Sequence, residues 1–470
     1  MSRKTERMRK NNSAEAMPRY LRVLGNMKYR LIIEGIGVGL LAGILVSAFR
    51  LSLTKVDEIR SVLLEGAQTK ISLVVCCLLL LFFFTVCVSF IVTREPLCTG
   101  SGIPQVKGEL DGKIKANWLS VIIAKSIGGI MAVGGGLSLG REGPSIQLGA
   151  MVGKGFSRLS GRLRTEERLL MTCGAGAGLA AAFSAPLAGV VFTLEELHKT
   201  FSADVLLSTM AAAITSDWVA SYIFGLRPVF LLTISNSLPL SHYWMVLILG
   251  VIMGAFGVLY NRCIALSQDF FAMLKPAWIK AVLPFAAIVL LAVFYPRVLG
   301  SGHDLVSFAG EGGAGVKVLL ILLVIKFIFS IFSFGTGAPG GIFLPLLVLG
   351  AVTGGLFTEI VSPLVGYANT YSAYFVILGM AGYFAAIVRA PITGIILISE
   401  MTGIFSNLLP LAIVSLVAHI TAEILGGVPI YDQLLDRMLS GRANYEKTAA
   451  RRPGENLPKG GRPNKARTDV

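Results

Sequence analysis

The sequence has little charge for its length. Only 15% of the 470 residues are charged, whereas 54% are hydrophobic and the mean hydropathy is +0.73. This balance, together with long apolar runs, excludes an ordinary soluble domain and predicts an all-α polytopic membrane protein. Segments close to the roughly 20 residues of a spanning helix are residues 32–50, 72–93, 206–225, 243–262, 280–295 and 407–425. Other apolar segments are shorter and interrupted by glycine.

Cysteine and histidine are also scarce. The four histidines are scattered, and the six cysteines lack metal-ligand spacing and lie mostly in apolar segments: Cys76, Cys77, Cys87, Cys98, Cys173 and Cys263. We therefore expect buried thiols, with a disulfide framework as the less favoured alternative, and neither a metal site nor a cofactor. A small-residue cleavage site is missing from the first apolar run, which argues against a removable signal peptide.

Acidic residues are fewer than basic ones, 27 against 42, which gives a net charge of +15. Nucleic acid is not the expected partner, because the basic residues gather at the two ends of the chain: residues 1–31 and 436–470 hold nine each. Basic flanks favour the cytoplasmic side, so we expect both termini there and an even number of membrane crossings. The Pro- and Gly-rich charged tail is expected to be disordered.

The sequence repeats internally. Residues 125–156 align with residues 326–357 at an offset of 201, with 12 identities in 32 positions. Residues 174–195 align with residues 379–400 at an offset of 205, with seven identities in 22. Chance similarity between Gly-rich membrane helices is the alternative, but the blocks share one order and nearly one offset. The sequence therefore predicts two structural halves.

We place the two halves at residues 32–230 and 231–436, between a basic cytoplasmic segment, 1–31, and the basic tail, 437–470. An odd number of crossings in each half would make the repeats inverted, as in many transporters, and an even number would make them parallel. Hydropathy alone leaves that parity open.

Three short segments are typical of helix starts: "GSGIP" (100–104), "GREGP" (140–144) and "GIFLP" (341–345). In each, a glycine allows unusual backbone geometry and a proline suits the first helical turn. Helix N-termini offer unpaired N–H groups and the positive end of the helix dipole. If these starts converge within the membrane, they form an anion site without a full buried positive charge.

The repeat also shows where the two halves differ in charge. The alignment pairs three glutamates with the other half: Glu142 with Phe343, Glu196 with Met401, and Glu195 with Glu400. A carboxylate at mid-membrane is costly, so it requires donors or a proton. We expect the glutamate present in both halves to be architectural and the two present in one half to be functional. Lys125 and Lys326 also occur in both halves, and we expect them to be architectural or to shape the electric field, with direct contact to a substrate less favoured.

These segments, with the tyrosine of "GVPIYDQLL" (Tyr431), resemble in order and spacing the signature segments of the CLC chloride channel and transporter family. The resemblance covers about residues 30–436. It implies a homodimer in the cell membrane, with an anion path in each subunit. It also implies two inverted-topology repeats of tilted and partly spanning helices, which resolves the question of parity.

The resemblance further implies site residues. The chloride-binding residues would be Ser101, Gly102, Ile103, Gly143, Ile342, Phe343 and Tyr431. Glu142 would be the external gating glutamate, and Glu196 the internal glutamate that passes protons. The function implied is exchange of chloride for protons. The alternatives are a passive chloride channel and a fluoride exporter, with a membrane enzyme much less favoured because the motifs show no nucleophile or metal cluster.

Each assignment has a simpler alternative. Glu142 could cap a helix or pair with Arg141, and Glu196 could be a solvated residue at a helix end. Tyr431 could be an interfacial anchor, and Ser101 could cap a helix. The chain also departs from some bacterial members of the family, because Gln105 and Lys107 replace acidic residues. That departure leaves the route by which protons reach the internal glutamate open.

Overall fold

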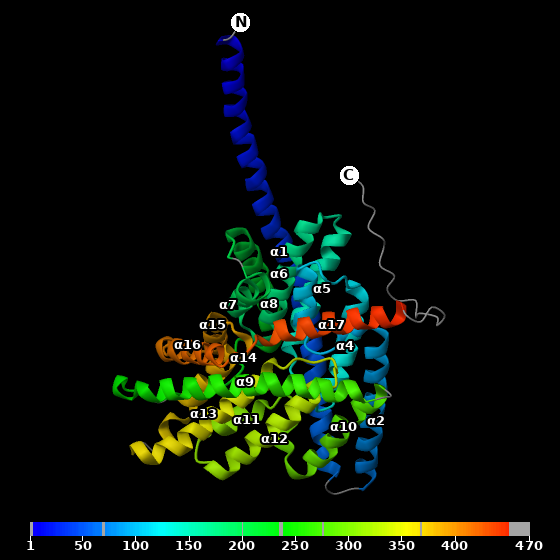
Figure 1. Ribbon diagram of the computed structural model, residues 1–470, viewed down its shortest axis with the longest axis vertical. Helices are drawn as coiled ribbons and strands as arrows, with labels where there is room; N and C mark the ends of the chain where they lie inside the picture. The colour runs from blue at the N-terminus through cyan, green and yellow to red at the C-terminus, as the bar shows by residue number, and fades with distance from the viewer. Residues whose placement is uncertain are drawn as a thin grey trace.

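The computed structural model describes the backbone of residues 3–67, 71–199, 201–234, 238–274, 277–366 and 369–450, and side chains over slightly narrower ranges. These residues form seventeen α-helices and no named strand (Figure 1), which confirms the predicted fold class. The helices are α1 (Arg3–Ala67), α2 (Ile71–Arg94), α3 (Ile103–Leu110), α4 (Trp118–Gly134), α5 (Glu142–Leu159), α6 (Arg164–Phe183), α7 (Pro186–Phe192), α8 (Ala203–Phe224), α9 (Tyr243–Met273), α10 (Ala277–Phe294), α11 (His303–Glu311), α12 (Val316–Gly335), α13 (Phe343–Val365), α14 (Ser372–Val388), α15 (Pro391–Thr402), α16 (Leu408–Ile424) and α17 (Ile430–Ala450).

Five shorter segments complete the helical content of the described residues. Four are 3-10 turns, η1 (Pro96–Cys98), η3 (Leu240–His242), η4 (Pro296–Val298) and η5 (Asn369–Tyr371), and one is a π-helical segment, η2 (Thr193–His198). In Figure 1, α2 runs vertically while α9 and α17 run nearly horizontally, so the helices do not form one parallel bundle.

Several helices are long and apolar enough to cross a membrane. In the described residues these spans are Tyr29–Leu63, Leu73–Arg94, Leu240–Met273, Val316–Gly335 and Phe343–Val365. The predicted spans at 280–295 and 407–425 form apolar helices that are shorter, and the span at 206–225 lies in α8, which is not among the five. The prediction missed the spans in α12 and α13, and in α13 the glycines read as interruptions. The helix runs unbroken through Gly350 and Gly354.

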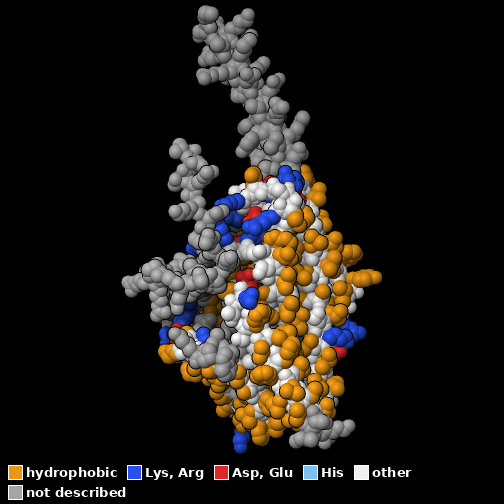
Figure 2. Space-filling view, turned by 90° about the vertical axis from the view of Figure 1, so that its right-hand side faces the viewer, with side chains coloured by type: hydrophobic (Ala, Val, Ile, Leu, Met, Phe, Trp, Pro, Cys, Tyr) orange, Lys and Arg blue, Asp and Glu red, His pale blue; other side chains and the backbone are white. Residues whose placement is uncertain are grey.

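The outer surface is strongly apolar. Figure 2 shows hydrophobic side chains over most of the face it displays, with charged groups in small clusters. On α2, for example, Leu79, Phe82 and Phe90 are each more than half exposed. A water-soluble monomer rarely exposes so large an apolar area, whereas a lipid-facing surface requires it. The chain is therefore a multi-pass membrane protein.

The two halves meet through reciprocal backbone contacts. Gly140 and Gly341, which are equivalent in the repeat, form an antiparallel bridge: Gly140 N–H donates to Gly341 O at 2.6 Å, and Gly341 N–H donates to Gly140 O at 2.8 Å. A second pair of equivalent bonds runs from Gly100 N to Gly337 O at 3.2 Å and from Gly300 N to Gly136 O at 2.9 Å. A pseudo-twofold axis therefore passes through this glycine bridge, as expected for two related repeats.

The repeat extends to unusual backbone conformations. Among the described residues, three non-glycine residues have positive φ, and two of them, Ser184 at 52° and Arg389 at 70°, are equivalent positions at the offset of 205. Each precedes an Ala-Pro pair that begins a short helix, α7 or α15. Since such a conformation is uncommon for residues with a Cβ, its occurrence in both halves indicates a shared local structure.

Equivalent glycines also allow the closest helix packing in each half. On α5, a Cβ at Gly149 would overlap the carbonyl oxygen of Gly174 on α6. On α13, a Cβ at the equivalent Gly350 would lie 2.5 Å from the carbonyl oxygen of Gly379 on α14. Small residues let membrane helices approach until their backbones touch. This packing fixes where α5 and α13 begin, which is the part of the fold that matters for the site.

The ends of the described chain are helical. The basic segment placed at residues 1–31 is continuous with the first span, because α1 runs from Arg3 to Ala67. At the other end α17 runs to Ala450, so residues 437–450, which were expected to be disordered, are helical. The buried side chains of Leu434 and Leu435 fix the start of that helix against the protein body. Residues 451–470 lie outside the described residues.

We predict that Gly149→Val lowers the thermal stability of the purified protein strongly, by at least ~1–3 kcal/mol in unfolding free energy, because overpacked side chains would push α5 from α6. Thermal unfolding in detergent, followed by loss of the folded peak in size-exclusion chromatography, measures the effect. The matched control is Gly441→Ala, where a Cβ meets nothing within 4 Å. Equal stability of the two variants would contradict this account of the packing.

Candidate functional site

Three predicted helix starts converge at one point inside the protein. A Cβ on Gly143, at the start of α5, would lie 2.6 Å from the carbonyl oxygen of Ser101, just before α3. A Cβ on Gly341, just before α13, would lie 3.1 Å from the backbone nitrogen of Gly143. The segments "GSGIP", "GREGP" and "GIFLP" are therefore in direct contact, and we call them the helix-start cluster.

The helix-start cluster presents backbone donors to its centre. The first residues are Ile103 in α3, Glu142 and Gly143 in α5, and Phe343 in α13, and the N–H groups at such positions have no partner within their own helix. Gly102 precedes α3 with φ of 93°, a conformation that favours glycine. Ile342 is the residue directly before α13. Each predicted backbone position thus lies at a buried helix start.

Two hydroxyl groups in this region lack partners. Ser101 and Tyr431 are 2% and 0% exposed, and neither Oγ nor the phenolic oxygen has a hydrogen-bond partner among the protein atoms described. Ser101 does not cap α3, and the complete burial of Tyr431 rules out a role as an interfacial anchor. Buried hydroxyls without partners are rare, because they lose hydrogen bonds to water. Both hydroxyls can therefore donate a hydrogen bond to an acceptor placed beside the three helix starts.

Aromatic rings connect the tyrosine to the helix-start cluster. The ring of Phe192 contacts that of Tyr431 edge-on, with centroids 6.5 Å apart, and that of Phe343 with centroids 6.3 Å apart. The ring centroid of Phe384 lies 4.9 Å from that of Phe343. Sequence analysis missed Phe192 and Phe384, since apolar residues in apolar helices give no distinguishing signal. The rings exclude water from the site and so strengthen its electrostatic interactions.

Two buried lysines fix the turns before α3 and α11. Lys125 donates to the carbonyl oxygens of Cys98 at 2.9 Å and Gly100 at 2.6 Å. Lys326 makes the equivalent bonds to Val298 and Gly300, both at 2.8 Å. The charge of each lysine therefore faces carbonyl groups of the turn before α3 or α11. This geometry confirms the prediction that both lysines are architectural.

Glu142 is the first residue of α5 and is completely buried. Its carboxylate oxygens accept no hydrogen bond from the described residues, although the backbone N–H groups of Glu142 and Leu344 interact with it electrostatically. Arg141 Nε lies 3.9 Å from Oε1, at the limit of an ion pair. The carboxylate is therefore held at the starts of α5 and α13 by partial charges. This attraction is weak enough for an anion to displace the carboxylate, or for a proton to neutralise it.

Glu196 lies in η2 and is only 3% exposed. The alternative interpretation of Glu196 as a solvated residue at a helix end is therefore wrong. Lys107 Nζ donates to Glu196 Oε1 at 2.7 Å and also forms an ion pair with Asp432, which in turn accepts from Lys199 Nζ at 2.9 Å. Although burial alone would raise it, the bonds from Lys107 and Lys199 lower the pKa of Asp432 below its usual range. The sequence had marked Lys107 as a departure but not as a partner of Glu196.

The other replacement after "GSGIP" has a structural role. Gln105 Nε2 donates to the carbonyl oxygen of Thr99 at 2.8 Å. The side chain of Gln147, one turn into α5, donates similarly to Leu97 O at 2.8 Å. Both amides therefore fix the turn that carries Ser101, and neither lies in the chain of charges around Glu196.

The glutamate pair shared by both halves is architectural, as expected. Glu195 accepts from the N–H groups of Ile392 and Thr393 at 3.2 and 2.7 Å, at the start of α15. Glu400 accepts from the N–H groups of Leu187 and Ala188 at 3.1 and 2.8 Å, at the start of α7. Each half thus caps a helix of the other.

The cysteines differ in part from the prediction. All six are free thiols, and Cys98 and Cys173 are buried, but Cys76 is exposed and the other three are partly exposed. Cys76 lies in α2, many of whose side chains are exposed on the apolar outer surface. This apolar segment therefore faces lipid, whereas burial inside the protein was expected.

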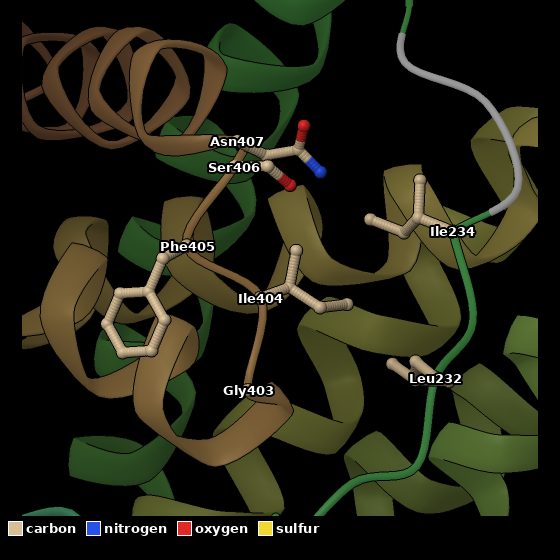
Figure 3. Close-up of a pocket in the computed structure, with 7 residues that line it drawn as sticks. All are labelled: Leu232, Ile234, Gly403, Ile404, Phe405, Ser406 and Asn407. Atoms are coloured by element: carbon tan, nitrogen blue, oxygen red, sulfur yellow. The ribbon is translucent and has the colours of Figure 1, made fainter.

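An open cavity lies elsewhere in the described part of the chain. It is lined by Leu232, Ile234, Gly403, Ile404, Phe405, Ser406 and Asn407, from the connections that follow α8 and α15 (Figure 3). None of the predicted site residues lines it. The contact between the three helix starts is instead buried, and no large cavity is needed for a single small ion to fit there.

These features define a class of protein. It is a multi-pass membrane protein with two related halves, whose interior brings three helix starts together and buries two carboxylates present in one half only. Residues 83–423 match the family described as voltage gated chloride channel. The chain belongs to this family, the CLC family.

The relatives are transporters. The chain is 38% identical over 416 residues, covering 86% of this chain and 89% of the relative, to the H(+)/Cl(-) exchange transporter ClcA of Vibrio cholerae serotype O1. It is 37% identical over 385 residues to the protein of the same name from Yersinia pseudotuberculosis serotype IB, covering 79% and 80% of the two chains.

Solved structures share the fold. A slow cyanobacterial Cl-/H+ antiporter matches with a TM-score of 0.83 at 32% identity, over 87% of this chain and 98% of the other. A CLC-type fluoride/proton antiporter matches with a TM-score of 0.69 at 24% identity, over 84% and 96%. At that identity the second likeness concerns the fold alone.

We predict that Glu400→Ala lowers the thermal stability, by roughly 1 kcal/mol, because α7 loses the acceptor for two N–H groups at its start. Glu423→Ala is the control, since the side chain of Glu423 is 73% exposed. Unchanged stability of Glu400→Ala, measured by thermal unfolding, would contradict the capping role.

Proposed function

We propose that this protein exchanges chloride, and similar monovalent anions, for protons across the cell membrane. The observation that carries the proposal is the placement of two buried carboxylates present in one repeat only. Glu142 lies within the helix-start cluster. Glu196 lies in η2 and is joined through Lys107 to Asp432 at the start of α17. The chain's similarity to proteins named as chloride–proton exchange transporters supports the same conclusion.

Chloride would bind at the centre of the helix-start cluster. The donors are the hydroxyls of Ser101 and Tyr431 and the backbone N–H groups at Gly102, Ile103, Gly143, Ile342 and Phe343. Partial charges attract an anion without holding it as tightly as a buried lysine would, so the ion can leave again. The lysine charges nearest the cluster face carbonyl groups instead. Such donors favour monovalent anions generally over one particular ion.

Glu142 would act as the external gate and as a proton carrier. When ionised, its carboxylate occupies an anion position at the starts of α5 and α13. When protonated, it loses the attraction of these helix dipoles and can move aside, which admits chloride. Chloride binding and ionised Glu142 therefore exclude each other. That exclusion couples an inward proton step to an outward chloride step, or the reverse.

Glu196 would pass protons between the cytoplasm and Glu142. It is nearly buried, yet its ion-pair partners lead through Asp432 to Lys199, which is 54% exposed. Tyr431 directly precedes Asp432, which shares Lys107 with Glu196, so the start of α17 carries both a hydroxyl of the anion site and part of this ion-pair chain. A passive channel would not need a second buried carboxylate, and this favours exchange over a channel.

The membrane arrangement is also proposed. We infer that both termini are cytoplasmic, because the two ends of the chain are strongly basic. We further propose a homodimer within the lipid bilayer, in keeping with the family. Crosslinking in native membranes, analysed by gel electrophoresis, tests the dimer, and accessibility of single introduced cysteines at each end tests the orientation.

We predict that the protein in liposomes moves protons against their gradient when a chloride gradient is imposed and the voltage is clamped. Glu196→Gln and Glu142→Gln should both abolish proton movement, because neither amide carries a proton, while chloride still passes. External pH and chloride efflux are recorded together, and Glu423→Gln, at an exposed site, is the control. Chloride flux without proton flux in the wild type would instead identify a channel.

We predict that Tyr431→Phe weakens chloride binding about 10-fold, since one hydrogen bond to an ion contributes ~1.5 kcal/mol. Isothermal titration with chloride on the purified protein gives the affinity. Tyr383→Phe is a matched control, because the Tyr383 hydroxyl is also buried and without a partner but its ring packs against Phe256 and Tyr260 of α9. An unchanged affinity in Tyr431→Phe would exclude the hydroxyl as a ligand.

A further inference from the structure

A line of four charged side chains runs from the protein surface to Glu196. Lys199 is 54% exposed, Asp432 is 30% exposed, and Lys107 and Glu196 are 6% and 4% exposed, counting side chains. The charges alternate in sign, and each contacts the next. Lys107 is the only member that touches two carboxylates within this line, at 2.7 Å from Glu196 Oε1 and in direct contact with Asp432.

These four residues come from three separate elements. Lys107 lies in α3, which begins directly after Ser101 and Gly102. Asp432 lies in α17, one residue after Tyr431. Glu196 lies in η2, and Lys199 directly follows that segment. The ammonium of Lys107 therefore joins the segment of the proton glutamate to both segments that carry the hydroxyl groups of the anion site.

We propose that Lys107 is a positioning residue that clamps Glu196 in its ionised form and limits how fast protons reach it from the cytoplasm. This inference rests on the proposed role of Glu196 in proton transfer. Lys107 would thus control the step in which protons enter from the cytoplasm.

The physical basis is the burial of the pair. Burial by itself favours the protonated form of Glu196, and the ammonium of Lys107 opposes this, because protonating the carboxylate would leave a buried ammonium with less compensation. A proton can neutralise Glu196 only if the contact with Lys107 is broken. Asp432 stays available as a second partner for Lys107 when that happens. The clamp thus has a closed state with two carboxylates bound and an open state with one.

Other groups around Glu196 determine the sign of each variant's effect. Lys107 faces it from α3, Asp432 and Tyr431 face it from α17, and Lys199 faces it from its own segment. His198 lies two residues further along the same segment. Removing a positive neighbour favours the protonated form of Glu196, and removing a negative neighbour favours the ionised form.

The first test compares wild type with Lys107→Gln in liposomes at equal pH on both sides. We expect the midpoint of proton transport against pH to move up by about one unit, which is a tenfold change in protonation. At alkaline pH the variant should carry protons several-fold faster. Lys107→Arg, which keeps the charge, should restore the wild-type midpoint. Lys113→Gln is the control, since Lys113 is an exposed lysine paired with Asp111.

A second variant keeps the test sharp if Lys107→Gln fails to fold. Asp432→Asn leaves Lys107 in place but removes its other partner, so the midpoint should move in the opposite direction, to lower pH. A shift of both variants in one direction, or no shift in either, would overturn the clamp. So would an equal effect of Lys107→Gln on chloride flux with and without Glu196→Gln, since Lys107 would then act directly on the anion.

Infrared titration separates this inference from the proposed function. The carboxylic acid band that is absent in Glu196→Gln reports protonation of Glu196 whether or not protons are transported. The band should form at lower pH in wild type than in Lys107→Gln. If that holds while the wild type carries no protons, the exchange function fails and the clamp stands. Equal titration of wild type and Lys107→Gln overturns the clamp itself.

Discussion

Burying helix N-termini inside a membrane protein is the constraint on which the rest of the structure depends. In lipid, backbone N–H groups without partners are costly unless they are enclosed by protein or face a polar ligand. Here three helix starts meet at one point, and the turns before α3 and α11 are fixed by Lys125 and Lys326. The donors are therefore preorganised and enclosed, and an anion is the ligand that satisfies them.

The twofold relation between the halves explains how the chain builds such a point. Reciprocal bonds at Gly140 and Gly341 bring the equivalent starts of α5 and α13 together. Exchange of caps by Glu195 and Glu400 fastens α15 and α7 in the same way. The proposed function then depends on departures from symmetry. Glu142 faces the cluster where its counterpart, Phe343, supplies an aromatic wall.

Much of this could be predicted from the sequence, for physical reasons. Glycine and proline at fixed positions marked the helix starts, and the repeat separated Glu142 and Glu196 from the architectural pair. The spans in α12 and α13 were missed, and in α13 the reason is that glycines that allow close packing read as interruptions. The contact between Lys107 and Glu196 was missed as well, since 89 residues separate them along the chain. Only the packing of α3 against η2 brings them together.

The most direct measurement is anomalous diffraction from crystals grown in bromide, an anion that replaces chloride and can be located by its scattering. The account predicts one bromide peak between Ser101 and Tyr431 in the wild type. In Glu142→Gln a further peak should occupy the place of the Glu142 carboxylate, because the anion and ionised glutamate compete for it. Bromide absent from the helix-start cluster, or an unchanged pattern in Glu142→Gln, would contradict the account.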